Sequence, residues 1–130
     1  LVTIDFQDAV VGPVCYDAVS LLRDCYVRWP EAQVLAWSRD FYQQLQAEGY
    51  YQAGFAAFQR DFDFVGLQRH IKVLGIFCRL NYRDGKSGYM ADLPRVYGYV
   101  VDVANRYHEL QPFAHWLASI VPSEWQEQCA

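Results

Sequence analysis

The sequence predicts a mainly α-helical fold, with one or two short N-terminal strands followed by about five helices. Three observations support this prediction. Apolar residues recur at helical spacing through most of the chain, prolines and glycines stand at the ends of those segments, and a strand-like apolar run occurs only at the beginning. With 130 residues, 53% of them hydrophobic, the chain has enough apolar material for the core of one domain over residues 1–130.

The N-terminal segment begins as a strand and continues as a helix. The apolar run Leu1–Asp5 is typical of a strand, and a Gly-Pro pair at residues 12–13 follows it. We expect a first helix over Val14–Trp29, because Pro13 suits the first helical position and Pro30 disfavours helical geometry in the residue before it. The buried face of this helix is predicted to contain Val14, Ala18, Leu21, Leu22, Cys25, Tyr26 and Trp29.

Two further helices are predicted in the middle of the chain. Glu31–Ala47 is amphipathic and is followed by Gly49, a residue suited to a C-terminal cap. Phe55–Arg83 is apolar most of the way round, which is typical of a central helix, and Gly66 and Gly75 would allow close packing or a kink. The inward residues predicted for the first of these helices are Val34, Leu35, Trp37, Phe41, Tyr42 and Leu45.

The remaining third contains a loop, two more helices and a tail. Residues 84–88 (Asp-Gly-Lys-Ser-Gly) have the composition of a loop. A fourth helix is expected over Asp92–Tyr107, with Pro94 in its first turn, and a short fifth over Glu109–Val121. Residues 122–130 are predicted to form a tail.

Composition and charge exclude several classes of protein. A net charge of −4 without a basic cluster argues against nucleic-acid binding, and the chain contains no apolar run long enough to span a membrane and no signal-peptide pattern. The cysteines lack metal-ligand spacing, and three of them stand among apolar residues, so a reduced, cytoplasmic protein is expected. Because the chain starts with Leu1 inside a strand-like run, we expect a piece of a longer protein; a processed mature chain is the alternative.

Three carboxylates near the N-terminus are candidates for a metal or binding site. Asp5 and Asp8 stand where the predicted strand ends, and Asp17 stands in the first turn of the predicted helix. Hard cations such as Mg²⁺ bind carboxylate oxygens and share them with phosphates. On spacing alone, the alternatives stay open that Asp5 and Asp8 are turn residues and that Asp17 stabilises the helix dipole.

A polar patch interrupts the predicted central helix. Arg69, His70 and Lys72 follow one another among apolar residues, which suggests that this helix borders a polar cleft. The alternative is that His70 is a hydrogen-bonded core or boundary residue. The chain has no G-x-x-x-x-G-K-[ST] loop, no strand lysine for phosphates, and no His-x-Asp segment followed by Asn that would supply a catalytic base.

Two groups of motifs resemble known phosphotransferases. The first resembles the metal-binding segment of the aminoglycoside phosphotransferase family and comprises Ile4–Ala9, Gly12-Pro13, Tyr16-Asp17 and Leu21–Asp24. The second resembles, within that family, the bacterial anomeric kinases of N-acetylmuramate and N-acetylglucosamine, and comprises Gly66–Phe77, Arg83–Lys86 and Asp92–Val96. Together they cover essentially the whole chain.

The resemblance implies a fold, a reaction and roles for individual residues. The chain would be the helical C-terminal lobe of a protein-kinase-like fold, taken from an enzyme that uses ATP and Mg²⁺ to phosphorylate a sugar in cell-wall (peptidoglycan) recycling. Asp5 would be the Mg²⁺ ligand that bridges the ATP phosphates, and Asp17 would brace the catalytic loop. Asp8, Arg69 and His70 would be candidates for the substrate side.

The chain departs from the family pattern in a way that bears on activity. The nucleotide-binding lobe and the catalytic loop would precede Leu1 and are absent from this sequence. We therefore expect the 130 residues to be inactive alone and to self-associate through exposed apolar surface. The acceptor could instead be an aminoglycoside, choline or another alcohol, and the chain could also be a non-catalytic helical interaction module.

Overall fold

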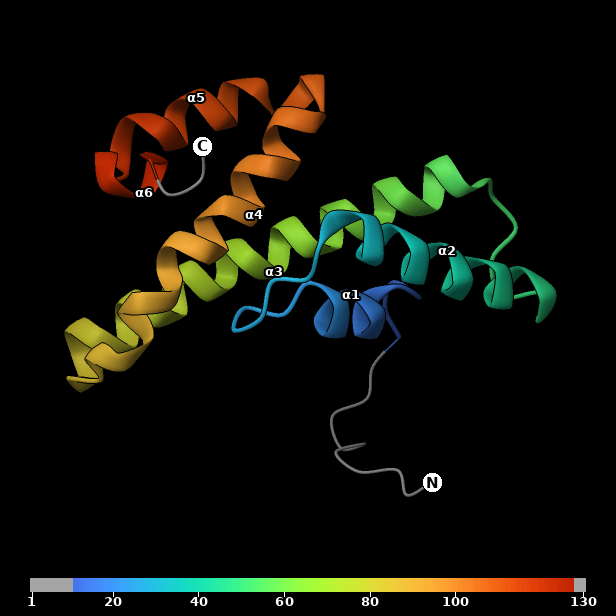
Figure 1. Ribbon diagram of the computed structural model, residues 1–130, viewed down its shortest axis with the longest axis horizontal. Coiled ribbons are helices and arrows are strands. Elements are labelled where there is room, and N and C mark those ends of the chain that lie inside the picture. Colours follow the sequence, from blue (N-terminus) through green and yellow to red (C-terminus); the bar gives the residue numbers. More distant parts are fainter. Residues whose placement is uncertain (1–10, 128–130) are drawn as a thin grey trace.

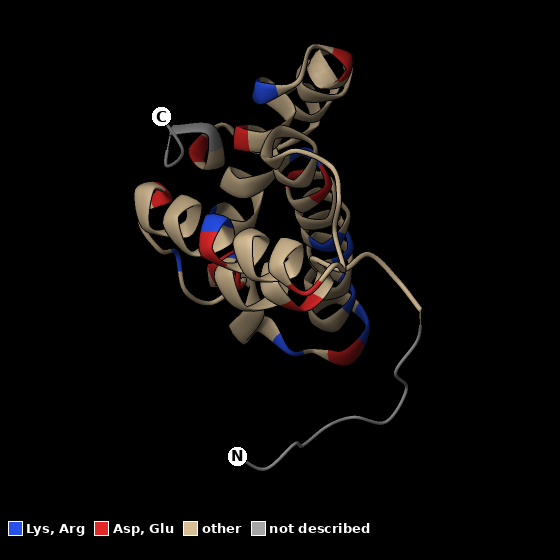
Figure 2. Cartoon of the chain, turned by 90° about the vertical axis from the view of Figure 1, so that its right-hand side faces the viewer, with Lys and Arg blue, Asp and Glu red and all other residues tan. Residues whose placement is uncertain are grey.

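The computed structural model describes residues 11–127, which form six α-helices and two short 3-10 helices (Figure 1). The mainly α-helical prediction is confirmed. No strand occurs within 11–127, and the predicted strand at Leu1–Asp5 lies outside the described residues. Acidic and basic residues are interspersed over the helices (Figure 2).

The longest helix, α3 (Phe55–Asp84), runs through the molecule and contacts α1, α2 and α4 (Figure 1). Its end is set by Gly85, which has a left-handed φ of 65°. There the N–H groups of Gly85 and Lys86 donate to the carbonyls of Asn81 and Leu80, at 3.2 and 2.9 Å. These two hydrogen bonds satisfy the last carbonyl groups of the helix, and the left-handed conformation that they require favours glycine. The predicted central helix is confirmed to within one residue.

One core forms where α1 (Tyr16–Leu22) and α2 (Glu31–Ala47) pack beside the N-terminal half of α3. Phe58 is fully buried at its centre, with ring centroids of its aromatic neighbours 5.5–6.2 Å away. Aromatic rings bury large apolar areas, so this cluster is a main source of stability for this end. Its aromatic members are Phe41, Tyr42, Tyr51, Phe55, Phe58 and Phe62.

The C-terminal half of α3 packs against the 3-10 helix and the α-helix that follow it. The 3-10 helix η1 (Ser87–Asp92) leads into α4 (Leu93–Arg106), and η2 (His108–Leu110) leads into α5 (Gln111–Ile120). The apolar face of α4 is completely enclosed here, since Leu93, Val96 and Val100 have no exposed surface. The predicted fourth and fifth helices are confirmed to within two residues at each end.

The first predicted helix is wrong in length, because α1 ends at Leu22 and not at Trp29. Asp24 causes the early end: its carboxylate accepts the N–H groups of Tyr26 and Val27, at 2.7 and 3.2 Å, which a continued helix would use internally. Asp side chains compete with helical hydrogen bonds in this way. The helix also begins at Tyr16, so Pro13 stands before its first turn.

The C-terminal segment was predicted as a tail, and this is wrong for residues 123–127. They form the short helix α6 (Ser123–Glu127), and Trp125 packs against apolar clusters that contain the buried residues of α4. Burial of the Trp125 ring favours an ordered helix here, although the turn-like composition of the segment did not indicate one. None of the helices within 11–127 is both long and apolar enough to cross a membrane.

Candidate functional site

An apolar hollow lies between α1 and α2. Its volume is about 690 Å³, within the range of about 300–1,000 Å³ typical of binding sites. Seven of its eight lining residues are apolar or aromatic, and the eighth is the acidic residue Asp17. The lining consists of Val14, Asp17, Ala18, Leu21, Leu22, Trp29, Trp37 and Phe41.

The hollow corrects the predicted core face of the first helix. Val14, Leu21 and Trp29 were expected inside, but 39%, 72% and 42% of their surfaces are exposed. The buried apolar residues of this segment are instead Cys15 and Val19, which pack in the core beside α3. One side of α1 therefore packs in the core, and another apolar side lines the hollow.

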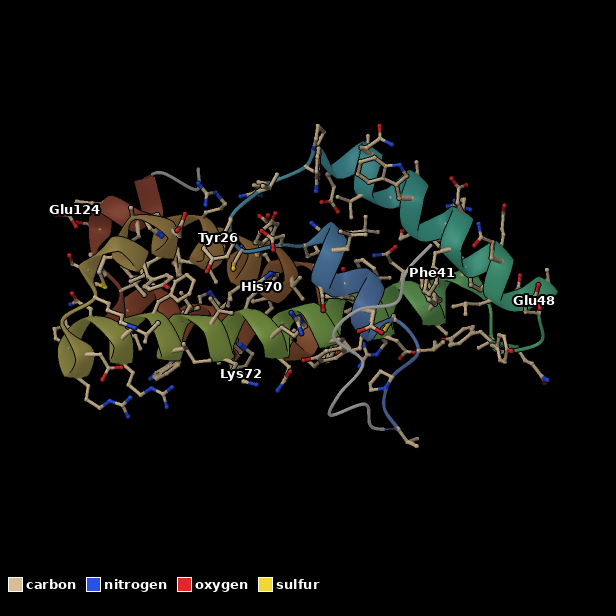
Figure 3. All side chains as sticks on the ribbon, turned by 90° about the horizontal axis from the view of Figure 1, so that it is seen from below. Tyr26, Phe41, Glu48, His70, Lys72 and Glu124 are labelled. Atoms are coloured by element: carbon tan, nitrogen blue, oxygen red, sulfur yellow. The ribbon has the colours of Figure 1, made fainter. Side chains whose placement is uncertain are left out.

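Two other residues expected in the core are also at the surface. Tyr26 and Leu35 are 52% and 42% exposed. Tyr26 follows the end of α1, so it no longer shares a helical face with the residues before it. Phe41, by contrast, points from α2 toward the core, where its ring lies 6.2 Å from that of Phe58 (Figure 3).

Asp17 stands in the first turn of α1, where the sequence placed it. Its side chain is exposed, and the structure gives its carboxylate no hydrogen bond or ion pair with any residue of the described part. A carboxylate in this position is stabilised by the helix dipole. It is also free to accept hydrogen bonds from whatever enters the hollow.

Arg69 lies near the same end of α1. Its guanidinium is 4.5 Å from the centroid of the Tyr16 ring, a cation–π contact between α3 and the start of α1. Lys72, one turn further along α3, is exposed and points away from the molecule (Figure 3). The predicted polar patch therefore divides, with Arg69 close to α1 and Lys72 in solvent.

His70 points into the molecule, away from Lys72 (Figure 3). It is 3% exposed, and its Nε2 lies 2.9 Å from the carbonyl oxygen of Arg23, which follows α1. A carbonyl only accepts, so Nε2 carries the proton. The ring stacks on Tyr99 with centroids 4.6 Å apart and planes at 9°. Burial lowers the pKa of His70 to about 4.

Next to His70 is a buried ionic network that the sequence did not reveal. Asp63 is 1% exposed and accepts hydrogen bonds from Arg106 and Tyr107, at 2.6 and 2.8 Å. Burial and the hydrogen bond to the Asp63 carboxylate raise the pKa of Tyr107. Asp63 follows Phe62 among the buried residues of α3. A charged residue between apolar neighbours in the predicted central helix was the sequence signal that could have revealed this buried carboxylate.

Glu31 links this network to the end of α1. It accepts two hydrogen bonds from Arg23, at 2.6 and 2.7 Å, and one from Arg106, at 3.3 Å. Burial raises the pKa of Glu31, but the Arg23 and Arg106 guanidinium groups outweigh it and hold the pKa below its usual value. The carboxylate is therefore ionised and fixed at neutral pH.

The described residues do not contain a metal site by themselves. Within residues 11–127, no three His, Cys, Asp or Glu side chains gather closely enough to hold a metal ion. Asp5 and Asp8 lie outside the described residues.

The chain is similar to bacterial proteins named N-acetylmuramate/N-acetylglucosamine kinase. It is 47% identical to that of Pseudomonas putida over 118 residues, 90% of this chain. It is 44% identical to that of Neisseria meningitidis over 122 residues, 93% of this chain, and 41% identical to that of Pseudomonas aeruginosa over 118 residues.

The chain spans only about a third of the length of these curated relatives, 35–36% in each case. No family model and no solved structure matches it. The expectation of a piece of a longer protein is consistent with this coverage.

Proposed function

We propose that this chain is the helical C-terminal subdomain of an ATP- and Mg²⁺-dependent phosphotransferase. The full-length enzyme would phosphorylate the anomeric hydroxyl of N-acetylmuramate or N-acetylglucosamine in the cytoplasmic recycling of cell-wall sugars. The observation that carries this proposal is the 41–47% identity, over about nine tenths of the chain, to three proteins named for that kinase activity.

Within this proposal, the carboxylates at the N-terminal end have distinct roles. Asp5 would hold Mg²⁺, which neutralises the phosphate charge that builds up during transfer, together with residues outside this chain. Asp17 would receive backbone N–H groups of the catalytic loop. The position of the Asp17 carboxylate at the wall of the hollow, without a hydrogen-bond partner among residues 11–127, supports this role.

The substrate-side candidates separate by position. Arg69 is the better candidate, because its guanidinium lies over the ring of Tyr16, the residue before Asp17 at the start of α1. His70 is enclosed, so we propose that it holds the Arg23 carbonyl and thereby the chain after α1, without touching substrate. Asp8 remains a candidate from the resemblance alone.

Turnover by the full-length protein tests the proposal. We expect Mg²⁺-ATP-dependent phosphorylation of N-acetylmuramate or N-acetylglucosamine in a panel that also contains aminoglycosides and choline. Asp5→Asn should lower kcat by about 10²–10³-fold, the effect of losing one charge-stabilising group, without lowering the unfolding midpoint. Asp102→Asn, on the exposed face of α4, is the matched control and should retain full turnover.

The other outcomes are equally informative. Turnover with only an aminoglycoside, choline or another alcohol would keep the phosphotransferase and reject the amino-sugar acceptor. No turnover with any acceptor would favour a non-catalytic helical module. The 130 residues alone should show no turnover, because they lack the nucleotide lobe and the catalytic loop.

A further inference from the structure

The outer side of the C-terminal half of α3 carries a basic row, Lys72, Arg79 and Arg83. All three residues are exposed, and Arg79 and Arg83 follow Lys72 by seven and eleven residues, about two and three turns of helix. Lys72 points away from the molecule (Figure 3). Within residues 11–127, Arg83 pairs with Asp84 at 2.7 Å, whereas Lys72 and Arg79 form no ion pair.

This part of α3 differs in charge from the rest of the chain. Residues 66–86 contain five Lys or Arg and one Asp, a net charge of +4. All other residues together contain six Lys or Arg and 14 Asp or Glu, a net charge of −8. The cations form no run in the sequence, because only the helix brings three of them to one side. A surface of this kind attracts an anionic partner.

An apolar row lies directly beside the basic row. Its members are Ile71, Gly75, Cys78 and Tyr82, spaced by four, three and four residues, which is the a/d spacing of a coiled-coil helix. Ile71 and Tyr82 are 42% and 81% exposed, and Cys78 is partly buried. A Cβ added at Gly75 would meet nothing within 4 Å. The apolar row is therefore open to a further helix, and Gly75 lets that helix approach closely.

The two rows together define the partner's chemistry. When the apolar row occupies positions a and d, Lys72 and Arg79 both occupy position e, because each directly follows a d residue, Ile71 or Cys78. Side chains at e and g pair across a coiled-coil interface and select the partner by charge. The complementary helix has apolar residues at a and d and carboxylates beside them. An acidic amphipathic helix therefore matches both rows.

Other partners match the two rows less well. A symmetric pair of copies would bring Lys72 and Arg79 against the same residues of the second copy, and like charges repel. Nucleic acid leaves the apolar row without a use, and the acidic remainder of the chain repels its phosphates. An anionic membrane is repelled in the same way, and Ile71 and Tyr82 offer little apolar surface for insertion.

We propose that this face of α3 is a docking surface for an acidic amphipathic helix of a partner protein. The partner's apolar side chains pack along Ile71, Gly75 and Tyr82, and its carboxylates accept hydrogen bonds from Lys72 and Arg79. The proposal concerns binding and does not depend on the proposed phosphotransferase activity. An active enzyme that fails to bind such a helix would refute it and leave the proposed function standing.

Fluorescence anisotropy with the full-length protein tests the docking surface. The probe is a labelled peptide of three heptads with Leu at a and d and Glu at e and g. We expect saturable binding that weakens as the salt concentration rises. A peptide of the same composition in scrambled order has no apolar face and should bind at least about tenfold more weakly. Equal binding of the two peptides, or no binding of either, would overturn the proposal.

Two double variants locate the binding. Lys72→Gln/Arg79→Gln and Arg28→Gln/Arg60→Gln each remove two exposed cations, so the two variants have the same net charge. The first should weaken binding about fivefold or more, because two interhelical ion pairs are lost, and the second less than about twofold. Equal weakening would show that only the net charge matters and would overturn the proposal.

A third variant separates helix docking from simple charge attraction. Ile71→Ser/Tyr82→Ser keeps every charge and should weaken binding about tenfold, because apolar contact area is lost. Unchanged affinity would overturn the proposal.

Phosphatidylglycerol vesicles and single-stranded oligothymidylate are tested under the same conditions. Tighter binding of either than of the peptide, lost in Lys72→Gln/Arg79→Gln, would assign this face of α3 to a membrane or to nucleic acid. Either result would also overturn the proposal.

Discussion

At the scale of single residues, His70 has the most specialised surroundings. Its ring lies between α3 and the segment after α1, stacked on Tyr99, with the Arg23 carbonyl as its hydrogen-bond partner. Its Nδ1 is buried and has no hydrogen-bond partner within the described part of the chain. Burial and the nearby charges of Arg23 and Arg69 lower the pKa of His70 and outweigh the Arg23 carbonyl and Asp24, which favour the imidazolium, so the ring is neutral at neutral pH.

This environment predicts that the chain loses stability in mild acid. The pKa of His70 is about 4 in the fold and about 6.5 when unfolded, so the unfolded state binds the extra proton between these values. The contribution of His70 is fully present above pH 6.5 and is lost as the pH falls to 4. It amounts to about 3 kcal/mol at most, at about 1.4 kcal/mol per pKa unit.

Urea denaturation at pH 7 and pH 5 measures this effect. We expect His70→Gln to reduce the difference in unfolding free energy between the two pH values, because glutamine can donate to the Arg23 carbonyl but does not titrate. His108→Gln, at an exposed position in η2, should keep the difference unchanged. An undiminished difference in His70→Gln would contradict the assignment.

At the scale of elements, side chains from α4 fix the segment that follows α1. Arg95 donates to the carbonyl of Cys25, and the Tyr99 hydroxyl donates to the carbonyl of Val27, both at 3.2 Å. Backbone groups outside helices need such partners when they are covered. The irregular segment is therefore positioned by long-range hydrogen bonds and not by its own secondary structure.

Two glycines of the long helix should respond in opposite directions to alanine. Gly85→Ala places a Cβ at a φ of 65° and should destabilise the chain by about 1–2 kcal/mol. Gly75→Ala lies inside α3, where an added Cβ meets nothing within 4 Å, and should stabilise it by about 0.5–1 kcal/mol. Thermal unfolding of the two variants checks both signs, and equal signs would contradict the capping role of Gly85.

At the scale of the whole molecule, one ionic network joins four elements. Arg23 follows α1, Glu31 begins α2, Asp63 lies in α3, and Arg106 ends α4. The chain Arg23–Glu31–Arg106–Asp63 is continuous through hydrogen bonds of 2.6–3.3 Å. It ties the α1–α2 side of the molecule to α4.

Asp63→Asn should therefore weaken the whole fold. Losing one partner of a fully buried ion pair costs about 3–5 kcal/mol, and here we expect about 2–3 kcal/mol because the Arg106 side chain is 37% exposed. Asp102→Asn is the control, since its pair with Arg28 has side chains 41% and 45% exposed and should contribute less than about 1 kcal/mol. Chemical denaturation of both variants measures this difference. Equal losses of unfolding free energy would show that the network does not hold the four elements together.

Local signals in the sequence predicted most of the helices. The bounds of α2 agree at both ends, and α3, α4 and α5 agree to within two residues, because apolar periodicity, Pro94 and the glycines at positions 49 and 85 act within a few residues of one another. The failure at α1 has a local cause as well, since Asp24 is three residues from Val27. The early end of α1 was missed because apolar residues keep their helical spacing beyond Asp24.

By itself, the sequence determined that the protein is built of helices, where most of them begin and end, and that its motifs resemble those of sugar phosphotransferases. Only the tertiary structure decided that Leu21 is exposed, that Asp63 and His70 are buried, and that Asp17 faces an apolar hollow. The physical reason is the sequence separation over which the two kinds of interaction act. Helix formation depends on residues up to about four positions apart, whereas burial depends on segments such as α1 and α3 that meet across more than forty residues of chain.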